Sequence, residues 1–420
     1  MTQLALRDHA IDDIVGGPVA PATMADRFAR SAAPAAPINL ELVSTFAAFE
    51  TLEDEWNALH RETARRAHAF QSFNWCWHWC RHYLGDGTAG PSLAIVTGRQ
   101  AGRLVLVMPL VTQRKAGLAE LTWLGEPVSQ YGDVLASGDA ATVRSLEAAW
   151  RFAVSRTRAD VANLRRVRED STAFALLAHL GASVTAAEEA PFLDLSKDTS
   201  FAGWEERRQP RARKNRRRHE RRLADEGEIG FCALSGSDEA ALLARHAVRL
   251  KRESLAGKGA ISLALADERF ERFFSNAAHG FDRPAGVSAL ALTSNGMPAA
   301  LKIMIETDDT AFLHVAVFEP KYEKHGVGSL LLERLVERTI LSGRSQLDLL
   351  PPRHTYKLDF ADGIVTVRDY AIALSAKGWL YTQGFLRVRR RIKSAIEALP
   401  KPLRRVIGKL ASPRREPVSP

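Results

Sequence analysis

A short loop near residue 325 combines two glycines with two side chains that can carry positive charge. The stretch runs Tyr322-Glu323-Lys324-His325-Gly326-Val327-Gly328-Ser329, and an apolar helical pattern follows from 327 to 341. Backbone N–H groups at a helix start favour anions, and glycine lets the backbone approach a phosphate closely. The loop therefore predicts a pyrophosphate site formed by Lys324, His325, Gly326, Val327, Gly328 and Ser329. A tight turn between a strand and a helix is the structural alternative.

Four titratable side chains close to this loop in the sequence are candidates for catalysis. His314 lies in the middle of a predicted strand and could act as a base, or it could simply be a core histidine. Asp348 ends the strand after the loop helix, where it could accept a proton, position an amine or cap a turn. Tyr356 could protonate a leaving group, while Lys357 could bind a phosphate of the acceptor, stabilise an oxyanion or remain solvated. Earlier in the chain, Asp133 is a candidate for acceptor contact, with a capped turn as the alternative.

The positive charge of the chain is concentrated in two segments. Of 420 residues, 58 are Lys or Arg and 49 are Asp or Glu, which gives a net charge of +9. Residues 207–222 carry ten basic residues and one acid (+9), and residues 387–415 carry eleven and one (+10), which leaves −10 for the rest. An anionic partner should therefore meet the chain at one of these segments.

The first basic segment could face an anionic acceptor or a tRNA, and Arg217 is the candidate contact within it. A solvated helix that links two domains is the alternative interpretation. The segment lacks interleaved aromatic residues and no known DNA-binding pattern surrounds it, so we do not expect DNA binding.

Cysteine usage argues against a disulfide framework and against a metal site. The three cysteines are Cys76, Cys80 and Cys232. On a helix, His78 would face away from Cys76 and Cys80, and no second pair of ligands follows. We therefore expect a tryptophan-rich core helix and no metal. Cys232 lies in a predicted strand without a visible histidine partner and is expected to be buried.

Hydrophobic periodicity divides the chain into a leader, two mixed α/β units and a tail. Residues 1–37 are rich in Ala and Pro and are expected to form a flexible leader. The first unit, 38–197, shows helical patterns at 46–64, 72–84, 140–156 and 171–180, and strand patterns at 93–97, 103–111, 121–124, 131–135 and 161–164.

The second unit, 198–375, begins with a basic helical stretch after Pro210. It continues with helices at 238–255, 267–279 and 327–341, and strands at 228–234, 287–293, 299–306, 311–318 and 346–350. Asn295-Gly296 and Asp308-Asp309 are hairpin signals between consecutive strands.

The tail, 376–420, has the pattern of a basic amphipathic helix. Apolar residues recur at steps of three and four among arginines, at Phe385, Val388, Ile392, Ala395, Ile396 and Leu399, with Trp379 and Tyr381 just before them. This pattern suits an anionic membrane surface, whereas packing back onto the body is the alternative. No apolar run is long enough to span a bilayer and no secretory signal is visible, so the expected location is the cytoplasm, with possible peripheral association with the inner face of the membrane.

The order of these motifs resembles the GNAT acetyltransferase superfamily, in which a loop after the third or fourth antiparallel strand binds the pyrophosphate of acetyl-CoA. A finer resemblance is to the branch of CelD-type cellulose-biosynthesis proteins, which is related to the FemAB peptidoglycan aminoacyltransferases. It rests on Phe318-Glu319-Pro320-Lys321-Tyr322, Gly326-Val327-Gly328, Leu347-Asp348-Leu349-Leu350, Tyr356-Lys357-Leu358-Asp359-Phe360, the basic run from Arg213, Met108-Pro109-Leu110 and Tyr131-Gly132-Asp133-Val134-Leu135.

The resemblance implies an α/β (α+β) fold with two GNAT-like mixed-sheet domains in tandem. It also implies an acyltransferase that moves an acetyl or other acyl group from acyl-CoA to an amine or hydroxyl. The acceptor would be a small molecule or a lipid-linked sugar for the envelope or an exopolysaccharide. Two alternatives stay open: a FemAB-like aminoacyltransferase that uses aminoacyl-tRNA, and a non-catalytic accessory protein that docks on a polysaccharide synthase through its tail.

Overall fold

The computed structural model describes residues 37–63, 67–85, 90–115, 117–260, 262–280 and 283–385. The described residues from Ile38 to Phe385 belong to one compact unit. The predicted leader, except for Pro37, and the basic part of the predicted tail beyond residue 385 lie outside the described residues.

The first half of the chain combines short helices with strands of two sheets. Its helices are α2 (Phe46–Glu50), α3 (Glu53–Thr63), α4 (Phe73–Tyr83), α5 (Val143–Thr157) and α6 (Thr172–His179). Its strands are β1 (Asn39–Val43), β2 (Ser92–Leu93), β3 (Ile95–Gln100), β4 (Arg103–Met108), β5 (Leu110–Lys115), β6 (Leu118–Trp123), β7 (Leu135–Ala136), β8 (Val161–Arg168) and β9 (Ser183–Asp194). The helix predicted at 46–64 is thus two helices, and only the end of the predicted strand 131–135 is extended.

The second half of the chain carries the longer elements. Its helices are α7 (Phe201–Glu206), α8 (Pro210–Ala224), α9 (Asp238–Gly257), α10 (Leu263–Ala266), α11 (Glu268–Gly280), α12 (Val327–Leu341), α13 (Thr355–Leu358) and α14 (Ala376–Leu380). Its strands are β10 (Ile229–Leu234), β11 (Gly286–Ser294), β12 (Met297–Glu306), β13 (Thr310–Phe318), β14 (Gln346–Asp348) and β15 (Gly363–Ala373). Every helix and strand predicted here from 228 to 350 is confirmed to within two residues.

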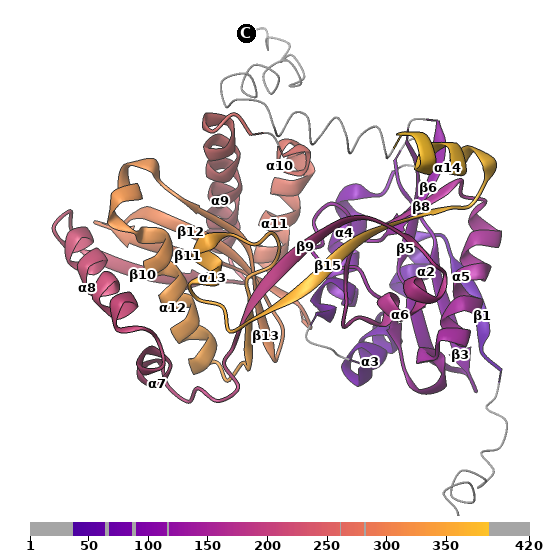
Figure 1. The fold of residues 1–420 in the computed structure, drawn as a ribbon, viewed down its shortest axis with the longest axis horizontal. Coiled ribbons are helices and arrows are strands. Elements are labelled where there is room, and N and C mark those ends of the chain that lie inside the picture. The colour runs from indigo at the N-terminus through magenta and orange to yellow at the C-terminus, as the bar shows by residue number, and fades with distance from the viewer. Residues whose placement is uncertain are drawn as a thin grey trace, which may run out of the picture. The chain divides into compact units, whose positions relative to one another are not determined.

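One sheet of eleven strands runs through both halves, in the order β10-β11-β12-β13-β14-β9-β15-β8-β6-β5-β2. A second sheet has the order β1-β3-β4-β7. Figure 1 shows β9 and β15 as a long pair that leads from the C-terminal strands to β8. The sequence did not predict these two strands: β9 contains Glu188, Glu189 and Pro191 and has no regular apolar alternation. The sheet is therefore continuous across residue 197, where the pattern predicts a domain boundary.

Helices cover both faces of the C-terminal strands. Leu301, Ile303 and Ile305 of β12 share one core with α9 and α11, whereas the alternate residues Ala300 and Met304 share another with α12. Successive side chains of β12 therefore point to opposite faces of the sheet, and both faces are buried.

Helix α4 connects the cores of the two halves. Its Trp75, Cys76, Trp79 and Cys80 are buried, and the Trp75 ring meets Phe273 of α11 edge-on at 4.8 Å between centroids. This is the tryptophan-rich core helix that the sequence predicts. Within the described ranges, no helix is long and apolar enough to cross a membrane.

Candidate functional site

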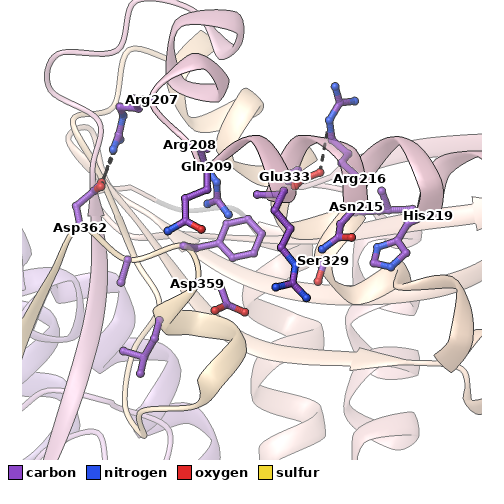
Figure 2. Close-up of a pocket in the computed structure, with 16 residues that line it drawn as sticks. Arg207, Arg208, Gln209, Asn215, Arg216, His219, Ser329, Glu333, Asp359 and Asp362 are labelled. Atoms are coloured by element: carbon purple, nitrogen blue, oxygen red, sulfur yellow. Dashed lines mark hydrogen bonds and ion pairs between the residues drawn. The ribbon is translucent and has the colours of Figure 1, made fainter.

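A cavity of about 730 Å³ lies between helix α8 and the first turns of α12 (Figure 2). Its wall is formed by Arg207, Arg208, Gln209, Arg211, Ala212, Asn215, Arg216 and His219, by Ser329, Leu330 and Glu333 of α12, and by Leu358 to Asp362 at and after the end of α13. Figure 2 shows Gln209 and Asn215 pointing to the side of the cavity where Asp359 and Ser329 lie. Segments from three parts of the second half therefore build one concave site.

Helix α8 faces the cavity on one side and a second groove on the other, and Asn215 lines both. Pro210 occupies its first turn, where the missing N–H costs nothing. Ala212, Asn215 and His219 recur at steps of three and four and line the cavity, and Leu223 continues this stripe into the core. The second groove follows the outer side and is lined by Pro210, Arg213, Lys214, Asn215, Arg217, Arg218, Arg221 and Arg222. Arg217 is thus exposed outside the cavity.

The arginines of the cavity fall into two groups. Arg216 pairs with Glu205 at 2.7 Å and Glu220 at 3.0 Å, and Arg207 pairs with Asp198 at 2.8 Å and with Asp362. These two cations are already neutralised.

Two further arginines, Arg208 and Arg211, make no ion pair within the described part of the chain. The guanidinium of Arg208 lies over the rings of Trp204 (4.8 Å) and Phe360 (4.2 Å), and burial lowers its pKa. A cation held over aromatic faces is fixed in position while its charge remains available. The cavity can therefore accept an anionic ligand.

Glu333 is the acidic residue of α12 in this wall. Burial raises its pKa to about 7, and the nearest cation, the Nε of Arg216, lies 3.9 Å from its Oε2. The carboxyl group is therefore partly protonated at neutral pH, which limits the negative charge that it adds to the cavity.

The loop predicted to bind pyrophosphate turns directly into α12. A helical turn at Pro320–His325 leads to Gly326, which caps α12 with φ of +63°. A Cβ atom added at Gly326 would collide with the imidazole ring of His219, so only glycine fits below α8. A Cβ at Gly328 would come no closer than 3.6 Å, to the ring of Phe318, so this glycine is not sterically required.

Of the six predicted loop residues, Ser329 lines the cavity. Val327 is buried in the core, Lys324 is exposed, and the Nε2 of His325 lies 3.2 Å from Glu226 Oε1. Arg208, Arg211, Asn215 and His219 also line the cavity, and none of them was named individually from the sequence. The three-to-four-residue spacing of 212, 215, 219 and 223 in the basic stretch was the signal that could have separated the inner from the outer face.

His314 is the extra residue of a bulge in β13. Val315 pairs with Ile303 and Leu313 with Met304, so His314 has no partner in the ladder. Its Nε2 donates to the carbonyl oxygen of Val128 at 2.6 Å, and Nδ1 has no hydrogen-bond partner among the described residues. Burial lowers the pKa of His314 to about 4, so the ring is neutral at pH 7. Aromatic rings surround it: Phe70, Trp75, Phe270 and Phe274.

Asp348 ties the end of β14 to the first half of the chain. Only 1% of its surface is exposed. It accepts hydrogen bonds from the Tyr131 hydroxyl (2.9 Å), Arg168 Nη1 (2.9 Å) and the backbone N–H of Leu350 (2.8 Å). Burial raises its pKa, and Arg168 opposes this effect. The carboxylate is therefore held in a fixed network and positions the strand end.

Lys357 and Tyr356 lie on α13, beside the cavity residue Leu358. Lys357 Nζ donates to the carbonyl oxygens of Leu350 (2.7 Å) and Pro352 (3.0 Å), and burial lowers its pKa to about 8. Tyr356 is 39% exposed and stacks on His354, and burial raises its pKa. An ammonium has three N–H donors, so Lys357 keeps one for a ligand.

Asp133 lies in the first half, at the start of α6. It accepts from the backbone N–H groups of Val134 (2.8 Å) and Ala173 (2.7 Å), and His68 Nε2 lies 2.8 Å away. This is a capping arrangement, separate from the cavity residues. In the part of the chain that the structure describes, no three His, Cys, Asp or Glu side chains gather as a metal site.

Comparisons with known proteins agree on the fold. Residues 210–358 match the family of acetyltransferase (GNAT) domains. The crystal structure of FemX is similar with a TM-score of 0.54 at 9% identity, over 79% of this chain and 98% of FemX. A tandem GNAT protein from the clavulanic acid biosynthesis pathway matches with a TM-score of 0.47 at 15% identity, over 80% of this chain and 99% of its own. No curated protein sequence matches the chain.

Residues 210–358 therefore match the acetyltransferase (GNAT) domain family, and the chain shares its fold with FemX. The predicted α/β fold with two GNAT-like mixed-sheet domains in tandem is confirmed. This fold implies an acyl-CoA co-substrate. The order of elements explains why the motifs could be recognised: β13, the loop, α12 and β14 follow one another in the chain as they do in the site.

Proposed function

We propose that this protein is an acyltransferase that moves an acyl group from acyl-CoA to an amine or hydroxyl acceptor. The acceptor is a sugar or a lipid-linked precursor of an envelope or exopolysaccharide, as the CelD-like motifs suggest. The observation that carries the proposal is the cavity beside α12, because it combines a helix start with Arg208 and Arg211, two cations that have no ion-pair partner among the described residues. Together these groups suit the phosphates of CoA.

The reaction needs a neutral nucleophile, a proton acceptor, a donor for the oxyanion and a proton for the leaving thiolate. In this proposal Lys357 uses its third N–H to stabilise the oxyanion. His314 is the candidate proton acceptor through its Nδ1, which has no hydrogen-bond partner among the described residues, although burial makes it a weaker base by lowering its pKa to about 4. Tyr356 protonates the thiolate, and Asp348 acts only as a positioning residue.

Calorimetric titration with acetyl-CoA and with free CoA tests the donor site. The variant is Arg208→Ala/Arg211→Ala, and the matched control is Arg217→Ala/Arg218→Ala, which removes the same charge from the outer side of α8. We expect micromolar binding that weakens tenfold or more in the first variant, because each charged hydrogen bond contributes about 1.5–3 kcal/mol. The control should bind within about twofold of the wild type. Absence of binding at millimolar acetyl-CoA contradicts the proposal.

The outer groove of α8 favours a second candidate, an aminoacyltransferase that uses aminoacyl-tRNA. Its exposed cations form a row along the helix, which suits a phosphate backbone. In this case tRNA binding should weaken steeply between 50 and 200 mM salt, by about 10³-fold if six phosphates are contacted. The two arginine pairs then exchange roles: Arg217→Ala/Arg218→Ala should weaken tRNA binding, and Arg208→Ala/Arg211→Ala should have the smaller effect.

We also propose that the C-terminal end binds an anionic membrane surface. Trp379 and Leu380 of α14 are 56% and 65% exposed, immediately before the basic segment of the sequence. The full chain should sediment with phosphatidylglycerol vesicles, whereas a chain that ends at residue 378 should stay in the supernatant. Equal retention of both chains contradicts this part. If the protein is instead a docked accessory protein, Lys357→Ala leaves cellular function intact while the truncation abolishes it.

A further inference from the structure

Leu350 has an unusual backbone conformation directly after β14. Its φ is +58°, in the left-handed region that a residue with a Cβ atom rarely adopts, and only 1% of its surface is exposed. Its N–H donates to Oδ1 of Asp348 at 2.8 Å, so the carboxylate closes the turn. A residue in such a conformation persists only where its surroundings hold it, and residues of this kind cluster at functional sites. The turn is therefore maintained by the side chains around it.

The carbonyl group of Leu350 holds the ammonium of Lys357. Nζ donates to this oxygen at 2.7 Å and to the carbonyl oxygen of Pro352 at 3.0 Å. Lys357 is only 6% exposed, and it forms no ion pair with a carboxylate in the described ranges. Both acceptors belong to one turn, residues 350–352. The direction of the remaining N–H of Lys357 therefore follows from the conformation of this turn.

Two residues of the first half hold the carboxylate that closes the turn. The Tyr131 hydroxyl lies 2.9 Å from Oδ1 and 3.0 Å from Oδ2 of Asp348, and Nη1 of Arg168 donates to Oδ2 at 2.9 Å. The Arg168 guanidinium also lies over the Tyr131 ring, 4.9 Å from its centroid, and both residues are buried. A continuous series of contacts therefore leads from the first half through Asp348 to the peptide group that holds Lys357.

We infer that Tyr131 and Arg168 are positioning residues for Lys357. They act through the carboxylate of Asp348 and the peptide group of Leu350, and so set the direction of the third N–H of the ammonium. The inference rests on the proposed acyl transfer, in which this N–H stabilises the oxyanion. Displacing a catalytic group by about 1 Å can lower a rate about a hundredfold. Neither Tyr131 nor Arg168 lines the cavity that suits the CoA phosphates, so the first half contributes geometry to this site.

Competitive labelling of the lysines in the full chain with trace acetic anhydride tests this inference, because mass spectrometry of the peptides gives a rate for each lysine. The main variant is Tyr131→Phe, which removes one hydroxyl and keeps both charges of the Arg168–Asp348 pair. A second variant, Arg168→Lys, keeps the charge and loses the planar fork. The matched control is Tyr83→Phe, because the buried hydroxyl of Tyr83 has no hydrogen-bond partner among the described residues.

Two other lysines serve as internal references. Lys115 is exposed and calibrates the reagent, whereas Lys302 is buried and reports global unfolding. We expect both variants to raise the labelling rate of Lys357 by about three- to tenfold, because a lost hydrogen bond shifts the local equilibrium toward an open turn. The rates of the two references, and every rate in Tyr83→Phe, should stay within about twofold of the wild type. An unchanged rate at Lys357, or an equal rise at Lys302, overturns the inference.

Release of CoA from acetyl-CoA, with glucosamine as the acceptor, separates this inference from the proposed function. Tyr131→Phe should bind acetyl-CoA like the wild type in calorimetry, because Tyr131 lies outside the cavity. Its kcat should fall about tenfold or more with an unchanged KM for acetyl-CoA. If the wild type is active and Tyr131→Phe has the same kcat, the inference fails alone. If the wild type neither binds acetyl-CoA nor releases CoA while the labelling of Lys357 still depends on Tyr131, the acyltransferase proposal fails and the positioning of Lys357 stands.

Discussion

Replacing Lys302 by methionine should make the protein more stable at neutral pH. Methionine keeps an unbranched apolar chain and removes the buried ammonium. The lysine pKa falls from 10.5 to about 7, first because of burial and then because of Lys357 and Lys251. At about 1.4 kcal/mol for each pH unit, this interval sets an upper bound of roughly 5 kcal/mol for the penalty, and local relaxation should leave about 2–4 kcal/mol.

The sign of the pH dependence follows from proton binding. The unfolded chain holds the proton of Lys302 up to pH 10.5, whereas the folded protein holds it only up to about pH 7. Between these values the unfolded state binds more protons, so the free energy of unfolding of the wild type falls as the pH falls. The advantage of Lys302→Met should therefore be largest below pH 7 and disappear above pH 10.5. Lys251 and Lys357 are present in both proteins, so their own titration cancels to first order.

Urea denaturation at pH 6.5, 7.5 and 9, extrapolated linearly to water, measures this difference. The exposed Lys115→Met serves as the control and should change the free energy of unfolding by less than about 0.5 kcal/mol. A destabilised Lys302→Met at pH 6.5 would refute the reasoning, because it would show that the ammonium has a stabilising partner. A difference that does not change with pH would refute the assigned pKa.

Three further substitutions test the rest of the site. Gly326→Ala should lower the free energy of unfolding by about 1–3 kcal/mol, because φ is +63° and the added methyl group meets the imidazole of His219 in α8. Gly328→Ala should change it by less than about 1 kcal/mol. Urea denaturation measures both variants, and equal losses would contradict the geometry. Asp348→Asn should cost about 3 kcal/mol, because it leaves the buried guanidinium of Arg168 with one carboxylate partner fewer, and an unchanged melting temperature would speak against the network. Burial raises the pKa of Glu333 from 4.5 to about 7, so the folded protein loses stability as the pH rises through this interval. Glu333→Gln should therefore be more stable than the wild type at pH 8 and bind acetyl-CoA severalfold tighter. Calorimetry that shows equal or weaker binding would reject this role.

The sequence by itself determined the C-terminal elements and their order. From β10 to β14 the apolar periods, the hairpin signals and the glycine loop are all local features, and local propensity and tertiary packing agree there. The α8 helix was also predictable, because good helix formers follow Pro210 at its start. These agreements are why the motif order could indicate a GNAT acyltransferase before any contact was known.

Only the tertiary structure decided which of the candidate residues come together. The partners of Asp348, Tyr131 and Arg168, come from the other half of the chain, and no sequence spacing reveals them. Strands β9 and β15 escaped prediction because their pairing with each other, not an apolar alternation, stabilises them. Lys302 looked like an ordinary strand residue, since burial and the approach of two other lysines arise only when α9, β12 and α13 pack. Long-range packing, which determines burial and charge proximity, therefore decided the chemistry of the site.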